Sequence, residues 1–153
     1  MASNSHGVQV AIQVALGLVI IALVYWLYVS ITEPYEAVKR QKQVTEDTRG
    51  RMLDIRAAMI RYEDLNGRYL TSLDSLVDFI RVDSLYAIAA DSIFGAGFVA
   101  DSLPYSPRTG KRFMLSVNDT ARVMTYLIQD PDSDDRIGTL QPDVTKLNAA
   151  SWE

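Results

Sequence analysis

The most prominent pattern in the chain is an apolar segment near its N-terminus. Residues 8–31 read VQVAIQVALGLVIIALVYWLYVSI, and the interruptions are Gln9, Gln13, Gly17 and Ser30. A helix of this length reaches roughly 36 Å, enough to cross a hydrocarbon core of about 30 Å. The pattern therefore predicts a short N-terminal tail over residues 1–7 and a membrane-spanning helix over residues 8–32, with the lipid bilayer as its surroundings.

Two other interpretations fit this segment less well. A cleaved signal peptide normally has a basic n-region and an apolar run of about 7–15 residues, whereas this run is longer and no Lys or Arg precedes it. A buried core helix would need more surrounding sequence than this short chain offers. The aromatic residues Tyr25, Trp26 and Tyr28 gather at one end of the run, where a membrane–water interface favours them.

The next segment, residues 33–66, has the periodicity of an amphipathic helix that continues the span. Pro34 predicts either a bend in the helix or a new start. Further on, apolar residues recur at spacings of three and four, which places them on one face: Met52, Ile55, Met59 and Tyr62. We predict that this face packs against a small folded domain, and that the helix ends at Asn66-Gly67.

Residues 67–140 alternate between short patterns, as expected for a small α+β domain. Thr71-Ser72 offers an N-cap for a short helix over residues 73–80. Residues 111–117 and 121–129 alternate around Asn118-Asp119-Thr120, which predicts a β-hairpin. Two or three strands would then cover the amphipathic face, and residues 141–153 would form a C-terminal tail. Trp152 is either a loosely held end residue or an anchor.

Charge and composition exclude several classes of function. Residues 1–32 contain no Lys, Arg, Asp or Glu, so the net charge of −4 belongs to the rest of the chain. A mildly acidic domain lacks the basic face of a nucleic-acid-binding protein. The absence of cysteine excludes disulfides and Cys-based metal sites. His6 is the sole histidine and precedes the span, so no His-based catalytic arrangement forms beyond it, and we expect no enzyme and no organic cofactor.

One acidic stretch raises the question of a metal ion. In DPDSDD, the carboxylates of Asp130, Asp132 and Asp134 alternate, as they do at the start of calcium-binding loops. No Glu closes the loop at the expected distance, and a solvated acidic turn gives the same pattern. Both interpretations, a Ca²⁺ site and a plain acidic turn, follow from the sequence.

A resemblance to a known family joins these elements. The run Ile55-x-x-Ala58-x-x-x-Tyr62-x-x-x-Asn66-Gly67-x-Tyr69-x-Thr71-Ser72-Leu73-x-x-Leu76-Val77 resembles the end of the long N-terminal helix in type II secretion pseudopilins and related type IV pilin-like proteins. It is also similar to segments of small envelope proteins of Bacteroidota. The resemblance implies a pilin-like α+β fold: a long helix packed on a short helix and a small antiparallel sheet.

The same resemblance implies a place and a function. Pilin-like domains lie outside the cytoplasm, which implies a bacterial inner-membrane protein with its N-terminus in the cytoplasm and its C-terminal domain in the periplasm. It also implies a structural subunit of a pilus-like or secretion-type assembly that associates with copies of itself. Pilins carry a Glu early in the apolar segment, whereas this run carries Gln9 and Gln13. An accessory subunit that packs against other membrane-protein subunits is therefore the second interpretation.

Overall fold

The computed structural model describes residues 4–120 and 122–153, except for the side chains of residues 4–6, 33, 34 and 87. Helix α1 extends over Asn4–Asn66 and is uninterrupted at Pro34. Residues 1–3 of the expected tail lie outside the described residues, and residues 4–7 already belong to α1. The chain divides into two units, Met1–Gln43 and Val44–Glu153, which are described separately below.

In the second unit, α1 ends where the sequence predicts. Gly67 has a φ of 66°, the left-handed conformation that glycine adopts without strain, and its N–H donates to the Glu63 carbonyl at 2.7 Å. Helix α2 (Leu73–Val82) then begins at Ser72, whose hydroxyl accepts from the backbone N–H of Asp74 at 3.2 Å. Both boundaries confirm the predicted helix–stop–helix pattern.

A third helix, α3 (Ser84–Ile93), follows α2 directly and was not predicted. Asp83 makes the junction, because its N–H donates to the Phe79 carbonyl while its carboxylate accepts from the N–H groups of Leu85 and Tyr86. The same aspartate therefore caps the end of one helix and the start of the next. The small apolar residues of this segment did not by themselves indicate a helix.

The sheet has three antiparallel strands in the order β1-β2-β3. Strand β1 (Met114–Asn118) pairs with β2 (Thr125–Gln129), with Ser116 opposite Leu127. This confirms the hairpin, although β2 begins later than predicted and the turn includes residue 121, which lies outside the described residues. Strand β3 (Arg136–Gly138) adds to β2, with Ile128 opposite Ile137. The fold class is α+β, as predicted.

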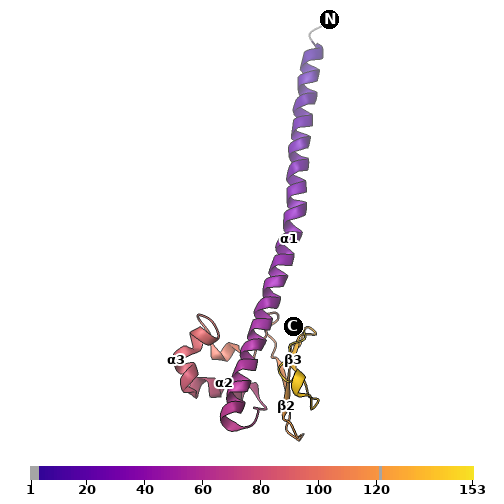
Figure 1. Ribbon diagram of the computed structural model, residues 1–153. Helices are drawn as coiled ribbons and strands as arrows, with labels where there is room; N and C mark the ends of the chain where they lie inside the picture. Colours follow the sequence, from indigo (N-terminus) through magenta and orange to yellow (C-terminus); the bar gives the residue numbers. More distant parts are fainter. Residues whose placement is uncertain (1–3, 121) are drawn as a thin grey trace. The chain divides into compact units, whose positions relative to one another are not determined.

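One hydrophobic core joins these elements. Figure 1 shows α2 and α3 on one side of the C-terminal part of α1 and the strands on the other. The core cluster takes side chains from each layer, among them Met52, Ile55, Met59, Leu76, Tyr86, Tyr126, Ile128 and Ile137. Tyr126 is fully buried, and its hydroxyl donates to Asn148 Oδ1 at 2.6 Å. The amphipathic face of α1 is thus the middle layer of the domain.

The C-terminal residues 141–153, which the sequence suggested as a tail, contribute to this core. Two 3-10 turns, Ala100–Ser102 and Val144–Lys146, complete the described secondary structure. Ala150 forms an isolated bridge with Ile137 and is buried. Trp152 packs against the core, and the Arg49 guanidinium lies 5.0 Å from its ring centroid. The interpretation of Trp152 as an anchor is therefore the one that the structure supports.

Candidate functional site

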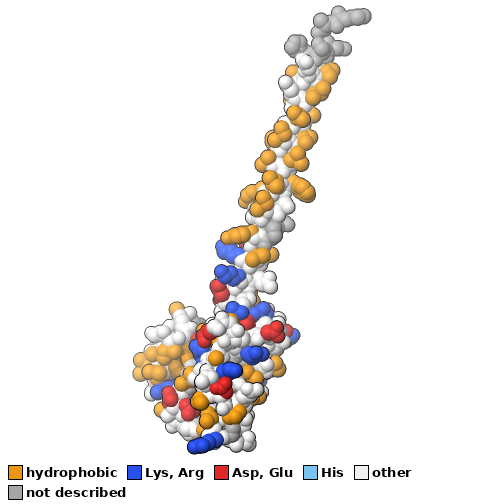
Figure 2. Space-filling view, turned by 45° about the vertical axis from the view of Figure 1, so that its right-hand side comes forward, with side chains coloured by type: hydrophobic (Ala, Val, Ile, Leu, Met, Phe, Trp, Pro, Cys, Tyr) orange, Lys and Arg blue, Asp and Glu red, His pale blue; other side chains and the backbone are white. Residues whose placement is uncertain are grey.

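The first candidate region is the apolar part of α1 in the first unit. Among the described residues, α1 is the one helix long and apolar enough to cross a membrane, and none of its most apolar window is buried within the chain. Figure 2 shows hydrophobic side chains along this part of the helix. The predicted interface residues Tyr25, Trp26 and Tyr28 are 70%, 72% and 66% exposed. Exposed apolar surfaces of this extent mark sites of contact with a membrane or with another protein.

The predicted packing residues lie in the second unit. Met52, Ile55 and Met59 are completely buried. Tyr62 is half-buried, and its ring meets Phe79 edge-on with a centroid distance of 5.0 Å. This stripe of α1 holds the helix to α2 and the sheet, so it belongs to the structural core.

The acidic loop after β2 does not gather its carboxylates around a common point. Asp130 accepts from the Ser133 hydroxyl at 2.7 Å and lies 3.4 Å from Arg108 Nε. Asp132 accepts from Lys111 and Thr109, while Asp134 is exposed. In the described part of the chain, no three His, Cys, Asp or Glu residues form a group that could hold a metal ion. Cationic side chains thus lie against the carboxylates of Asp130 and Asp132, and the Ca²⁺ interpretation of Asp130, Asp132 and Asp134 stays a prediction.

The loop instead takes part in an ion-pair network that the sequence did not reveal. The Arg49 guanidinium donates to both carboxylate oxygens of Asp135, at 3.1 Å from Nε and 2.9 Å from Nη2. Arg108 Nη2 lies 3.7 Å from Asp135 and its Nε faces Asp130. The hydrogen bonds to Asp135 raise the pKa of Arg49. Residues 49 and 135 are far apart in the sequence, and no local pattern links them.

This network predicts a clear mutational effect. Arg49→Ala should lower the free energy of unfolding by about 2 kcal/mol, because it leaves the largely buried Asp135 carboxylate with a single, longer ion pair. Arg49→Lys should recover part of the loss, since lysine keeps the charge but not the bidentate geometry. Urea unfolding of the full chain in detergent micelles measures both.

The control is Lys146→Ala, which removes the same charge from a side chain that is 67% exposed. It should change the unfolding free energy by less than about 0.5 kcal/mol. Equal effects at positions 49 and 146 would contradict a specific role of the network.

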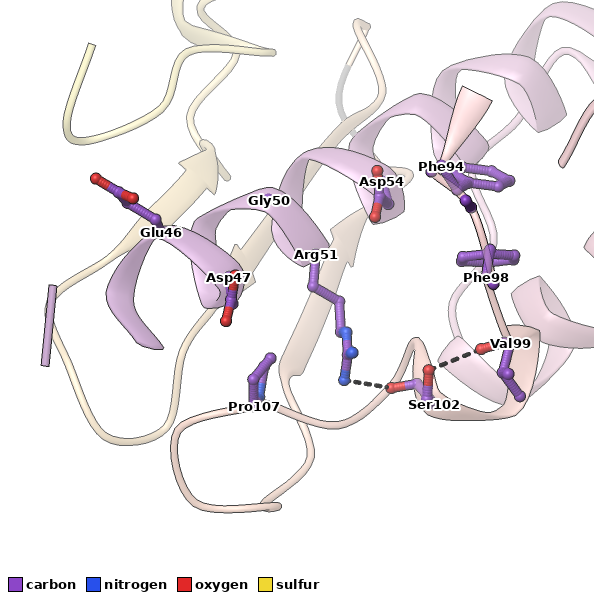
Figure 3. A pocket seen from close by; sticks show the side chains of 13 residues that line it. Glu46, Asp47, Gly50, Arg51, Asp54, Phe94, Phe98, Val99, Ser102 and Pro107 are labelled. Carbon is purple, nitrogen blue, oxygen red and sulfur yellow. Dashed lines mark hydrogen bonds between the residues drawn. The ribbon is translucent and has the colours of Figure 1, made fainter. Parts of the chain in front are cut away.

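The second unit also contains an open groove of about 400 Å³. Its floor is one face of α1, where Asp47, Arg51 and Asp54 follow at spacings of four and three. Its other wall is the loop after α3, with Phe94 and Phe98 stacked at a centroid distance of 4.2 Å. Figure 3 shows Arg51 reaching to Ser102, whose carbonyl accepts from its guanidinium at 3.1 Å.

Asp54 is the most perturbed acid in this groove. Partial burial raises its pKa to about 6, and the nearby Arg51 opposes the shift. The Arg51 guanidinium also donates to the carbonyl of Tyr105 at 2.9 Å, so two backbone carbonyls accept its hydrogen bonds. The Ser102 hydroxyl donates to the Val99 carbonyl at 2.7 Å. Of the two hydrogen-bonding side chains described here, Arg51 and Ser102, each is bonded to backbone carbonyls, and Asp54 is the carboxylate of the lining whose pKa is shifted.

A pH-dependent stability follows from Asp54. Between its unfolded pKa, about 4, and its folded pKa, about 6, the folded state binds more protons, so stability falls as the pH rises through this window. Asp54→Asn should therefore raise the unfolding free energy by about 1 kcal/mol at pH 7.5, after allowance for partial exposure, and by almost nothing at pH 4.

Asp47→Asn is the matched control, because Asp47 lines the same groove on the same helix face and is exposed. Thermal melts of both variants at the two pH values give the comparison. A gain for Asp54→Asn that is as large at pH 4 as at pH 7.5 would contradict the proposed titration.

Comparisons with known proteins leave the chain without an assigned family. No protein-family model, no curated protein and no solved structure matches it. The pilin-like interpretation therefore depends on the residues and the layout of elements described above.

Proposed function

We propose that the protein is a non-enzymatic, single-span protein of a bacterial inner membrane and a structural subunit of a pilus-like or secretion-type envelope assembly. One observation carries the proposal: the helix with the charge-free apolar segment, α1, also supplies the buried stripe Met52, Ile55 and Met59 of the folded domain. A single helix that provides both a membrane segment and a domain core is the layout of pilin-like subunits.

The proposed topology has the N-terminus in the cytoplasm and the folded domain in the periplasm. We infer this orientation from the pilin-like layout, because the charges on the two sides of the span differ little close to the membrane and so give no clear preference. The chain has no cysteine, so a single introduced one reports its own side of the membrane.

Val144 is 66% exposed and suits such a probe. With Val144→Cys, a membrane-impermeant maleimide should label the protein once the outer membrane is permeabilised, while the inner membrane is intact. A cysteine in place of Ser3 should be protected under the same conditions. Labelling of Val144→Cys that requires an opened inner membrane would contradict the topology.

The second candidate function is an accessory subunit of a larger inner-membrane complex. It is favoured by Gln9 and Gln13, which occupy the part of the apolar run where pilins carry a Glu. Chemical cross-linking in membranes followed by native purification separates the two. A ladder of self-oligomers supports the structural subunit, and a fixed stoichiometry with unrelated chains supports the accessory subunit.

A further inference from the structure

The polar interruptions of the apolar segment lie on one face of α1. Gln9, Gln13 and Gly17 follow each other at a spacing of four, and residues four apart on a helix are neighbours on its surface. Ser30, the remaining interruption, lies about 100° around the helix from Gln13. The rest of the segment's surface is apolar or aromatic.

Gln13 would lie well inside the hydrocarbon if residues 8–31 span the bilayer. Its Cα is about 21 Å along the helix axis from Leu27, which stands among the aromatic residues at the other end. That places it roughly 9 Å inside the opposite boundary of a core about 30 Å thick. Within the described residues neither Gln9 nor Gln13 has a hydrogen-bond partner for its side chain, and a buried amide without a partner is unfavourable. Gln9 is near enough to the boundary to reach water.

Gly17 has no explanation within the chain. It does not have a positive φ, so its backbone does not require glycine. A Cβ at this position would meet nothing within 4 Å, so no side chain of the same chain needs the space. Glycine nevertheless weakens a helix relative to alanine. At a helix–helix contact in a membrane, it lets two backbones approach closely.

We propose that a second copy of this chain binds this face, with the two helices parallel and Gln13 opposite Gln13 of the other copy. The proposal depends on the membrane-spanning function proposed above and specifies its partner. Each amide then donates an N–H to the carbonyl oxygen of the other, so that a symmetric pair satisfies both. Gly17, one turn further along, gives the room for this approach.

The chemistry of the face favours an identical partner. An amide is both donor and acceptor and complements itself, whereas a charged partner residue would call for an opposite charge, and residues 1–32 have none. Copies inserted with the same topology are parallel by necessity, which brings equal residue numbers to the same depth. From Gln13 and Gly17 the face continues through Ile20, Val24 and Leu27 at alternating spacings of three and four, the repeat of left-handed helix pairs.

The cysteine-free sequence allows a direct test in membranes that contain the full chain. Ile20→Cys places a thiol on the proposed face, and Leu18→Cys places one on the opposite side of the helix at nearly the same depth. Mild oxidation should yield a disulfide-linked dimer at position 20 and about fivefold less or none at position 18. Adding Gln13→Leu should lower the dimer fraction at position 20 about fivefold, since interhelical polar contacts contribute modestly. Adding Ser30→Leu, which also replaces a polar residue by leucine but lies about 100° around the helix from Gln13, should leave it unchanged.

The outcomes separate the two proposals. Equal dimer at positions 18 and 20, no response to Gln13→Leu, or an adduct at position 20 whose mass is not that of two copies would overturn the second-copy proposal. In each of these cases a chain that stays in the membrane pellet leaves the proposed function intact. A chain recovered in the soluble fraction overturns the membrane-spanning function, and with it the proposed pairing in the bilayer.

Discussion

Gly138→Ala is expected to lower the free energy of unfolding by about 4 kcal/mol, enough to unfold a marginally stable domain. Gly138 ends β3 with a φ of 86°, where an alanine is strained. A Cβ at this position would lie 2.2 Å from the Tyr126 carbonyl oxygen and 3.0 Å from that of Leu147. Both obstacles are backbone atoms, so no side-chain rotation relieves the clash. Urea unfolding of the full chain in detergent micelles, followed by far-UV circular dichroism, measures the loss.

Gly110→Ala is the control that separates the cost of the left-handed backbone conformation from the cost of the steric clash. Gly110 has a φ of 73°, and a Cβ there would meet nothing within 4 Å. This variant should lose only about 1 kcal/mol, the cost of the left-handed conformation alone. Similar losses at both positions would contradict the close approach of β2 to β3 and of residue 147 at Gly138.

Ile55→Ala should lower the unfolding free energy by about 3 kcal/mol. Ile55 is completely buried in the middle layer of the domain, so truncation leaves a cavity between α1, the short helices and the sheet. Leu65→Ala is the matched control, because Leu65 lies on the same helix and is 54% exposed. It should cost less than about 0.5 kcal/mol. A loss at position 55 no greater than that at position 65 would mean that the predicted face of α1 is not the core.

Local signals in the sequence were sufficient for the features that are determined locally. The stop at Asn66-Gly67, the cap at Ser72 and the β-hairpin each depend on residues that are near each other in the sequence, and the structure has all three. The buried face of α1 was readable for the same reason, since helical periodicity alone selects it.

The features that the sequence did not show depend on partners distant in the chain. Strand β3 has only three residues, and its place is set by β2 and by the bridge to Ala150. Asp135 looked like part of an acidic turn, but its partner Arg49 comes from α1. The raised pKa of Asp54 likewise arises from burial beside the loop after α3, which no spacing within α1 encodes.

The apolar part of α1 in the first unit could be predicted from the sequence, because its main feature is its composition. The sequence alone shows that residues 1–32 carry no charged side chain and how long the apolar run is. The structure adds that the helix is uninterrupted and that its apolar side chains are exposed. Partner contacts on that surface lie outside what one chain contains, which is why the Gln13 face calls for an experiment in membranes.

Alkaline carbonate extraction of membranes that contain the full chain tests the central claim most directly. A helix that spans the bilayer stays in the lipid pellet at high pH, whereas a peripherally bound protein is released. We expect the chain in the pellet, with residues 8–31 still present by mass spectrometry. Its release into the supernatant, or recovery of a shortened chain without this segment, would contradict the account of a membrane-anchored subunit.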